Sequence, residues 1–170
     1  MPLHNHPGMN GILKVVHGSL NVTAYDKIVD FDVKREQSNI PKRLRETRMD
    51  WINRGFIIPV KHVFSNTPLT PSSNPLILNP ESGNYHKIYN PGDEPAAFLD
   101  ILSPPYNHKG SELAMEGDSE PRECEYYKEL RLPFEDHDGG DKNICWLQMI
   151  PTPADFICDS ERYQGPPLEI

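Results

Sequence analysis

The sequence predicts an all-β fold, either a sandwich of two sheets or a small barrel, and three observations support this. The 170 residues include 18 prolines, about twice the usual share, and proline disfavours long helices. Short segments rich in β-branched and aromatic residues alternate with clusters of Gly, Pro, Asn, Asp and Ser. The length suits one hydrophobic core, so residues 1–170 are expected to form a single domain.

The expected strands can be placed in order along the chain. Two antiparallel strands are predicted at 9–16 and 20–26, where β-branched residues flank a turn at 17–19. Strands are also expected where apolar residues lie between turn signals: 76–78, 85–89, 96–102 and 144–151. Regular spacing of such short strands is what indicates a sandwich or barrel.

The charge balance argues against nucleic acid as a partner. The formal net charge is -8, and binding to phosphates needs a surplus of Lys and Arg. One basic run lies at 42–48, with Lys42, Arg43, Arg45 and Arg48. Given the negative total, this run is expected to be a solvated loop or a short surface helix rather than a patch for nucleic acid or anionic lipid.

The apolar runs and the cysteines of the sequence indicate where in the cell the protein is expected. No apolar run reaches the length of a membrane span, and the chain does not open as a signal peptide does, so neither is expected. The three cysteines, Cys124, Cys145 and Cys158, are odd in number and form no Cys-x-x-Cys motif. A disulfide framework is therefore not expected, and the reducing cytoplasm is the expected location.

Seven histidines are the residues of greatest chemical interest, at positions 4, 6, 17, 62, 86, 108 and 137. Alternate side chains of a strand lie on one face, so His4 and His6 are expected to point the same way and to offer a pair of metal ligands. Ordinary surface residues also form His-x-His pairs, and the pair alone does not decide between these interpretations.

Spacing strengthens the metal interpretation. Four residues separate His6 from Gly11, and six more lead on to Gly18. Far downstream, "PESGNYHKIYN" places His86 three residues after a glycine and four before an asparagine. These spacings resemble the two motifs of the cupin barrels, which supply His-x-His, usually with a nearby acid, and one further histidine. Because Gly11 or a neighbour stands at the place of that acid, the resemblance implies three neutral imidazoles, His4, His6 and His86, with no carboxylate ligand.

Three imidazoles indicate a reactive metal without selecting it. Imidazole suits iron, zinc, copper and nickel. Three ligands on one side of an ion leave the other side open, whereas structural zinc normally has a fourth protein ligand. The remaining histidines lie at a turn or in polar stretches and are expected not to be ligands: His17, His62, His108 and His137.

Longer motifs resemble one family, the thiol dioxygenases that include cysteamine (2-aminoethanethiol) dioxygenase and the plant cysteine oxidases. The matching segments run in order from residue 2 to 166: "PLHNHPGMNGILKVVHGSL", "ILNPESGNYHKI", "PAAFLDILSPPY", "ECEYYKEL" and "DFICDSERYQGP". The resemblance implies a cupin-type double-stranded β-barrel (jelly roll) and a non-haem Fe(II) enzyme that uses O2 to convert a thiol to a sulfinic acid. His4, His6 and His86 match the family's iron ligands.

The resemblance also implies substrates. Family members oxidise cysteamine and the N-terminal cysteines of peptides and proteins, and oxidation of a protein N-terminus serves oxygen sensing. A monomer is the oligomeric state that the family implies. The sequence does not position the loops around the pocket, so the preference between a small thiol and a protein N-terminus stays open.

Further site residues rest on the same resemblance, which makes Asp100, Tyr106 and Tyr126 the candidate catalytic residues. Asp100, a lone acid in "FLDIL", is implied to hold the substrate amine or to orient a ligand histidine; the alternative is a hydrogen-bonded structural acid. Tyr106 matches a tyrosine near the family's pocket, with ordinary packing as its alternative. Cys124 and Tyr126 match a pair that can form a thioether crosslink; the alternative is a buried cysteine beside a core tyrosine. The other two cysteines are expected to be structural.

The family's enzymes carry a sizeable segment before His-x-His that includes the first strands of the barrel, and this chain begins three residues before His4. A barrel short of its first strands is therefore expected. Three explanations compete: a start placed at an internal methionine, a short form that is unstable or inactive, and a smaller barrel that still binds iron. Two alternative functions stay open, an inactive cupin that only binds a metal or a partner, and a zinc-dependent cupin isomerase or hydrolase.

Overall fold

The computed structural model describes residues 1–107, 121–133, 141, 143–162 and 164–166. These residues form antiparallel strands and little helix, so the all-β prediction is confirmed. The strands are β1 (Asn10–His17), β2 (Leu20–Lys27), β3 (Ile57–Leu69), β4 (Leu76–Leu78), β5 (Tyr85–Tyr89), β6 (Ala97–Ser103), β7 (Tyr126–Glu129) and β8 (Ile144–Ile150). The helical segments are a 3-10 turn (Gln37–Asn39), α1 (Lys42–Thr47) and α2 (Met49–Asn53).

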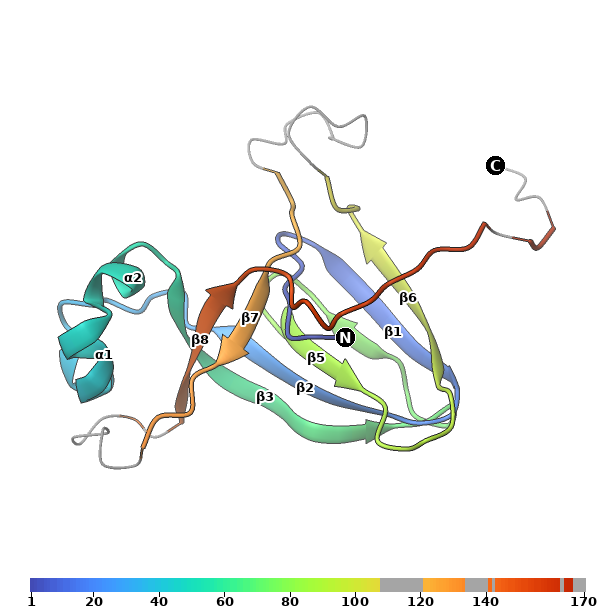
Figure 1. Cartoon of the computed structure of the whole chain (residues 1–170), viewed down its shortest axis with the longest axis horizontal. Helices are drawn as coiled ribbons and strands as arrows, with labels where there is room; N and C mark the ends of the chain where they lie inside the picture. Colours follow the sequence, from blue (N-terminus) through green and yellow to red (C-terminus); the bar gives the residue numbers. More distant parts are fainter. Residues whose placement is uncertain (108–120, 134–140, 142, 163, 167–170) are drawn as a thin grey trace.

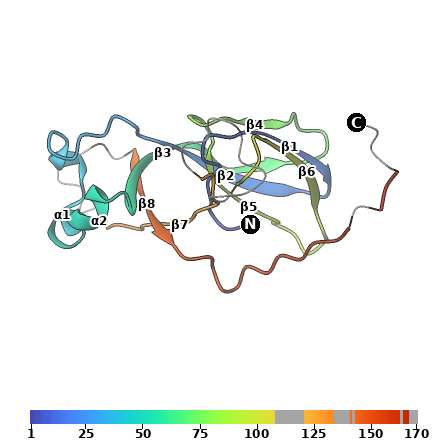
Figure 2. The ribbon, with the colours of Figure 1, turned by 90° about the horizontal axis from the view of Figure 1, so that it is seen from above.

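The strands divide into two sheets, as Figures 1 and 2 show. The smaller sheet has the order β4-β1-β6 and the larger has the order β5-β2-β3-β8-β7. The two sheets share an apolar cluster in which Leu13 and Val15 of β1 pack with Val22 of β2 and Ile88 of β5. Two antiparallel sheets around a common core are consistent with a cupin-type sandwich.

The first two strands lie where the sequence places them, but they are not partners. β1 pairs with β4 and β6, whereas β2 pairs with β3 and β5. The turn at 17–19 therefore carries the chain from one sheet to the other. A local pattern predicts that two segments are extended, but their partners depend on how the faces pack, which a short turn does not reveal.

Residues 3–5 join the two edges of the larger sheet. The backbone N–H of His4 donates to the His86 carbonyl at 3.0 Å, and that of His86 donates back to His4 at 2.9 Å. On the other side, the N–H of Tyr127 donates to the carbonyl of Leu3 at 2.9 Å. The edges of β5 and β7 are thus both paired with this segment. The larger sheet and residues 3–5 form a closed ring of strands, called the ring below.

Apolar side chains from every strand of the ring meet inside it: Leu3, Tyr25, Ile58, Val60, Tyr127 and Leu147, with Tyr85 packed against them. The register between β2 and β5 sets which side chains point inward. Tyr25 faces Tyr85 in this register, and Ala24 faces His86. Since neighbouring side chains of a strand point to opposite faces, His86 points out of the ring toward the smaller sheet.

The basic run lies on a short surface helix, which agrees with one of its two expected forms. It spans α1 and the residue that follows, and Leu44 of this helix is buried. Leu44 packs with Ile52 of α2 against Trp146, on the outer face of the ring. Figure 1 shows both helices beside β3 and β8. Among the described residues, no helix is long and apolar enough to cross a membrane.

Candidate metal centre

The first histidines of the chain lie on a segment held by a turn. Residues His6, Pro7, Gly8 and Met9 form it, with the N–H of Met9 donating to the carbonyl of His6 at 3.1 Å. Proline at the second position and a glycine with φ of 65° at the third are typical of a type II turn. A side chain at Gly8 would be strained at this φ. The turn directs the chain from His6 into β1.

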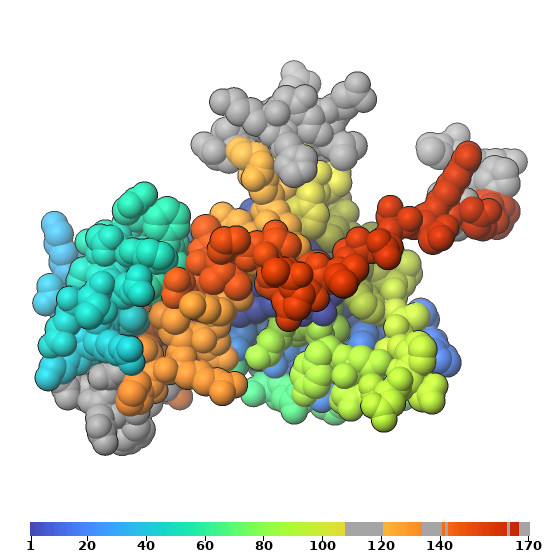
Figure 3. Space-filling view, in the orientation of Figure 1, coloured from blue at the N-terminus to red at the C-terminus, as the bar shows by residue number. Residues whose placement is uncertain are grey.

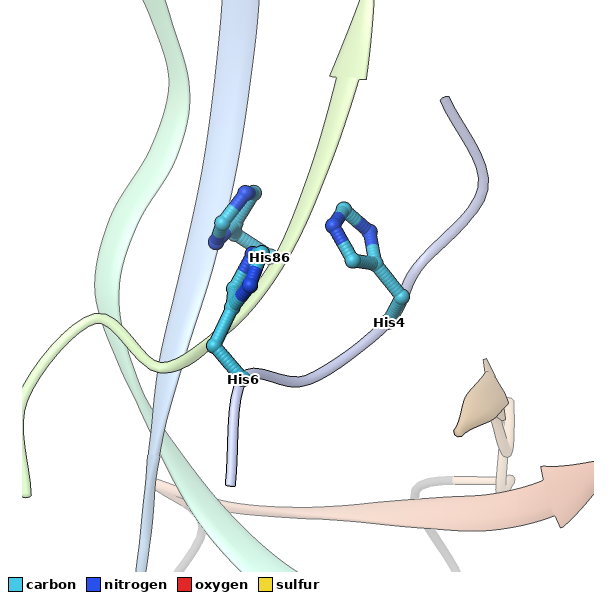
Figure 4. A group of neighbouring side chains, drawn as sticks. All are labelled: His4, His6 and His86. Atoms are coloured by element: carbon cyan, nitrogen blue, oxygen red, sulfur yellow. The ribbon is translucent and has the colours of Figure 1, made fainter. Parts of the chain in front are cut away.

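The structure brings His4, His6 and His86 together, as the sequence predicts. The centroids of the rings are 4.8 Å apart for His4 and His6, 4.7 Å for His4 and His86, and 5.0 Å for His6 and His86. One nitrogen of each ring lies within 4.8 Å of the others. Figure 4 shows two of these rings on the N-terminal segment and the third on β5. All three side chains are buried, with at most 2% of each residue exposed.

Each ring makes a hydrogen bond through Nδ1. Nδ1 of His4 lies 2.9 Å from the carbonyl of Pro2, and Nδ1 of His86 lies 3.3 Å from the carbonyl of Gly83. A carbonyl oxygen can only accept, so both rings carry their proton on Nδ1. The Nε2 lone pairs are then free. This is the arrangement in which an imidazole binds a metal while its other nitrogen is held in place.

The same three residues each have a buried polar atom without a hydrogen-bond partner. Nε2 of His4, His6 and His86 is buried without a hydrogen-bond partner in each case. Buried polar atoms are normally paired, and three unpaired lone pairs that share one small space are a strong exception. A transition metal ion would satisfy all three at once. The residues present therefore fit a metal ion.

Burial keeps the rings neutral. Loss of hydration lowers the pKa of His6 to about 3, and repulsion by His4 adds to this effect. For His86, burial is again the main cause, and repulsion by both other rings helps to lower its pKa to about 3. The pKa of His4 is lowered mainly by burial. A neutral imidazole is the form that binds metal, so little proton competition is expected at neutral pH.

Two asparagines that the sequence analysis did not select hold the histidine segment. Asn84 is buried, accepts a hydrogen bond from the N–H of His6 at 3.0 Å and donates to the carbonyl of His6 at 2.7 Å. Asn5 donates to a carboxylate oxygen of Glu125 at 2.8 Å and accepts from the N–H of Glu125 at 2.9 Å. For Asn5 a signal was present, since a buried polar residue between two histidines that share one face must find a partner on the opposite face.

Tyr106 contacts the centre directly. Its hydroxyl lies 2.6 Å from Nδ1 of His6 and donates to the carbonyl of Asn5 at 2.8 Å. Arg122, also missed from the sequence, helps to place it, because Nε of Arg122 donates to the carbonyl of Pro105 at 3.0 Å. Tyr106 thus serves the histidine segment in two ways, by orienting the ring of His6 and by satisfying the backbone beside it.

The remaining predicted residues lie around Tyr106. Burial raises the pKa of the Cys124 thiol, and the side chains of Tyr106 and Tyr126 counter this in part by lowering it. The ring of Tyr126 is 6.4 Å from that of His4. Asp100 faces inward from β6, and one of its carboxylate oxygens is buried without a hydrogen-bond partner. Burial raises the pKa of Asp100. Burial is also the main cause that raises the pKa of Tyr106, and the Asp100 carboxylate adds a smaller effect.

The C-terminal segment covers part of this region. In Figure 3 the residues after β8 cross in front of the N-terminal residues. Phe156 of this segment packs on Tyr126, with ring centroids 6.1 Å apart. The segment therefore shields the side of the centre where Tyr126 lies.

Close packing explains why no acid accompanies the histidines at Gly11. A Cβ atom built there would lie 2.8 Å from Cγ of Leu78 and 2.9 Å from Cδ2 of Leu102, so a side chain does not fit. Among the described residues, the group of candidate ligands at the centre contains imidazoles alone.

A cleft of about 440 Å³ lies on the other side of the histidine segment. It is lined by Asn5 and Asn84 and by three carboxylates, those of Glu81, Glu123 and Glu125. None of the three clustered imidazoles lines it. This cleft is therefore adjacent to the centre but does not open onto the nitrogen atoms that would bind a metal.

The other histidines lie elsewhere. His17 is exposed at the end of β1. His62 lies on β3, with Glu129 and Cys145 nearby. His108 and His137 lie outside the described residues.

Fold and site together define a class, an antiparallel β-protein with a buried centre of three imidazoles that could hold one metal ion. The chain belongs to the PCO_ADO family, whose family model matches residues 1–168. This membership confirms the family that the sequence motifs resemble.

Curated relatives carry names of the same kind. The chain is 33% identical to 2-aminoethanethiol dioxygenase of Homo sapiens, over 98% of this chain and 58% of that protein. It is also 33% identical to the Mus musculus protein of the same name, over 98% and 61%. Plant cysteine oxidase 1 of Arabidopsis thaliana is 30% identical, over 99% and 50%. The chain thus spans about half to three fifths of the length of these relatives.

Proposed function

We propose that the chain is a thiol dioxygenase whose three histidines hold Fe(II), and that it adds O2 to cysteamine or to an N-terminal cysteine to give a sulfinic acid. The observation that carries this proposal is the set of three buried Nε2 atoms without partners. The names of the relatives support the class of reaction, and the three clustered imidazoles support a bound metal. Bound Fe(II) would supply the one-electron steps that side chains lack.

The protein's own residues prepare the site for such a reaction. Burial and the Nδ1 hydrogen bonds hold the rings neutral and oriented, so a neutral ligand set leaves the full positive charge of the metal to attract a thiolate. Three ligands leave further positions free for substrate. Holding sulfur and O2 together supplies the proximity that the reaction needs.

Asp100 is the proposed partner of the substrate amine. Cysteamine and an N-terminal cysteine both present an amine two carbons from sulfur, and this group is an ammonium at neutral pH. The unpartnered carboxylate oxygen of Asp100 supports this role, because a buried acceptor gains most from a charged donor. Tyr106 positions His6. We further propose that the Cys124 sulfur bonds to the Tyr126 ring as a thioether, which the mutual influence of the two side chains on their pKa values supports.

The wider setting belongs to the same proposal. The protein is proposed to be a cytoplasmic monomer with no membrane or nucleic-acid partner. If it oxidises N-terminal cysteines there, its activity would report the O2 concentration. The net charge of -8 supports the absence of a nucleic-acid partner.

The test is O2 consumption by the Fe(II)-loaded chain with cysteamine and, separately, with a short peptide that begins with cysteine. O2 uptake that matches sulfinic acid formation by mass spectrometry, and that is lost in His86→Ala, is the expected result. The matched control is His17→Ala, which removes an exposed imidazole. Metal binding without O2 uptake would instead favour the inactive cupin, and turnover with Zn(II) that ignores O2 would favour the isomerase or hydrolase.

A further inference from the structure

A second group of metal-binding side chains lies at one end of the interior of the ring. It consists of His62 on β3, Glu129 on β7 and Cys145 on β8, and one potential ligand atom of each lies within 4.8 Å of the others. Nε2 of His62 is 3.8 Å from Oε1 of Glu129. The group is accessible, since 38% of the His62 side chain and 34% of the Glu129 side chain are exposed.

Sheet register explains why three distant segments meet here. His62 stands opposite Tyr25, Cys145 stands opposite Val60, and Glu129 follows two residues after Tyr127 on the same strand. Tyr25, Val60 and Tyr127 all belong to the interior cluster of the ring. Cys145 packs against that cluster as well. The three side chains therefore share the inner face, whereas His86 points outward, and the two centres lie on opposite faces of the ring wall.

A fully buried tyrosine holds the carboxylate. The hydroxyl of Tyr25 donates to Oε2 of Glu129 at 2.9 Å, and the ring of Tyr25 lies 4.5 Å from that of His62. Oε2 of Glu129 is thus hydrogen-bonded to a core residue, while Oε1 faces the imidazole of His62. A hydrogen bond to the outer oxygen of a ligand carboxylate is how proteins commonly orient such ligands.

A bound cation would change the ionisation of the groups around Glu129. The carboxylate of Glu129 and burial together raise the pKa of Cys145, with burial the larger cause. The same two influences raise the pKa of Tyr25. A divalent cation would reverse this, because it binds the thiolate and carboxylate and displaces the thiol proton.

We propose that His62, Glu129 and Cys145 bind a divalent transition metal of the zinc class, separate from the three-histidine centre. Nitrogen, oxygen and thiolate sulfur are all ordinary zinc ligands, and one thiolate with one carboxylate neutralises the ion. Zinc bonds of roughly 2.0–2.3 Å put tetrahedral ligand atoms roughly 3.5 Å apart, so the group must close by about 1 Å. The exposed side chain of His62 has the freedom to do so. The fourth position stays open to water.

The test uses Co(II), because a cobalt–thiolate bond gives a charge-transfer absorption in the near ultraviolet that imidazole ligands do not give. The protein is first loaded with Fe(II) without O2, and Co(II) is then titrated in. We expect one further equivalent to bind with this band, and Zn(II) to displace it, since zinc binds such sites more tightly than cobalt. The readout does not depend on catalytic activity, so it stands apart from the proposed function.

Variants assign the ligands. Cys145→Ser should abolish the band, and His62→Ala, at an exposed position, should weaken Co(II) binding by more than about tenfold. Two controls should leave the band unchanged: Cys124→Ser, near the other centre, and His17→Ala, at a surface histidine. Circular dichroism checks that each variant is folded. If Cys145→Ser does not fold, the Co(II) affinity of His62→Ala tests the proposal instead. The proposal would be overturned if the parent protein showed no band. It would also be overturned if the band persisted unchanged in Cys145→Ser and His62→Ala, or if it was lost in Cys124→Ser.

Discussion

The hydroxyl of Tyr106 stands between a side chain and the backbone of the histidine segment. It donates its proton to the carbonyl of Asn5 at 2.8 Å, so its oxygen accepts the proton on Nδ1 of His6, 2.6 Å away. His4 and His86 are held by backbone carbonyls instead. Of the three rings, His6 is therefore the one whose orientation a single side-chain substitution can release.

Tyr106→Phe is expected to weaken metal binding by roughly tenfold to a hundredfold, as loss of an outer hydrogen bond to a ligand histidine commonly does. Without the hydroxyl, the Nδ1 proton of His6 has no acceptor there and the ring is free to turn. Isothermal titration with Co(II) measures the effect. Tyr89→Phe is the matched control, because in the described structure the hydrogen bonds of that hydroxyl are exposed and involve only Asn21 and Asn66. Equal affinity for Tyr106→Phe and the parent would contradict this role.

Asn84→Ala is expected to destabilise the metal-free protein by about 1–3 kcal/mol, since it leaves the buried N–H of His6 unpaired and removes one of the two hydrogen bonds to the carbonyl of His6, which keeps the one from Met9. Urea unfolding followed by circular dichroism gives the change in free energy. Asn90→Ala, which removes an exposed asparagine from a turn, is the control and should change stability much less. If the two variants proved equally stable, Asn84 would not hold the segment.

The metal-free protein is expected to lose stability as the pH falls below about 6.5. Burial lowers the pKa of His6 and of His86 from 6.5 to about 3 in the folded state, so the unfolded state binds more protons between these values. Their contribution is complete above pH 6.5 and is lost as the pH falls toward 3, by up to about 1.4 kcal/mol per pH unit for each ring. Urea midpoints at a series of pH values from 8 to 5 measure this slope, and a flat profile would contradict neutral burial.

Asp100→Asn is expected to raise KM for cysteamine by roughly tenfold to a hundredfold, the value of about 1.5–3 kcal/mol for a hydrogen bond to a charged group. The reason is that an amide does not pair with the substrate ammonium as a carboxylate does. N-acetylcysteamine, which lacks the ammonium, should react equally poorly with both proteins. Asp93→Asn, in an exposed turn, serves as control. A loss in kcat alone, with KM unchanged, would point to a role other than amine binding.

Gly11→Ala is expected to destabilise the fold by about 1–3 kcal/mol, because its Cβ would enter the space of Leu78 and Leu102. Gly92→Ala is the control, since a Cβ there would meet its nearest atom at an ordinary 3.8 Å. Thermal unfolding of the two variants side by side makes the comparison. If Gly11→Ala left the stability unchanged, the side chains of Leu78 and Leu102 would be able to move apart and admit a methyl group.

Much of the architecture could be predicted from local patterns. Alternating and β-branched segments indicate strands close to where β1, β2, β4, β5, β6 and β8 lie, and the basic run forms a short helix, one of its two expected forms. β3 extends over Ile57–Leu69, well beyond what its patchily apolar sequence suggests, because its pairing with β2 and β8 holds it extended. Strand partners were not predictable, as the separation of β1 and β2 into different sheets shows.

The residues of the site also divide into those that could be predicted from the sequence and those that could not. His4 and His6 could be paired because alternate side chains of a strand share a face, and the resemblance to the cupin motifs added His86. Asn84 and Arg122 could not, since what makes them important is the backbone group each one meets across the fold. The sequence places His62 in a polar stretch and predicts no ligand there. Only the register of β3 with β8, and of β8 with β7, places it near Cys145 and Glu129.

By itself, the sequence determined the fold class, the family and the three clustered histidines, because these depend on periodicity and on short contiguous motifs. The tertiary structure alone decided that residues 3–5 close the ring, that the Nε2 atoms meet without partners, and that a second group of ligands lies within the ring. Each of these arises from contacts between segments far apart in the chain. Such contacts are set by packing and hydrogen bonding of the whole fold, to which no single stretch of sequence gives access.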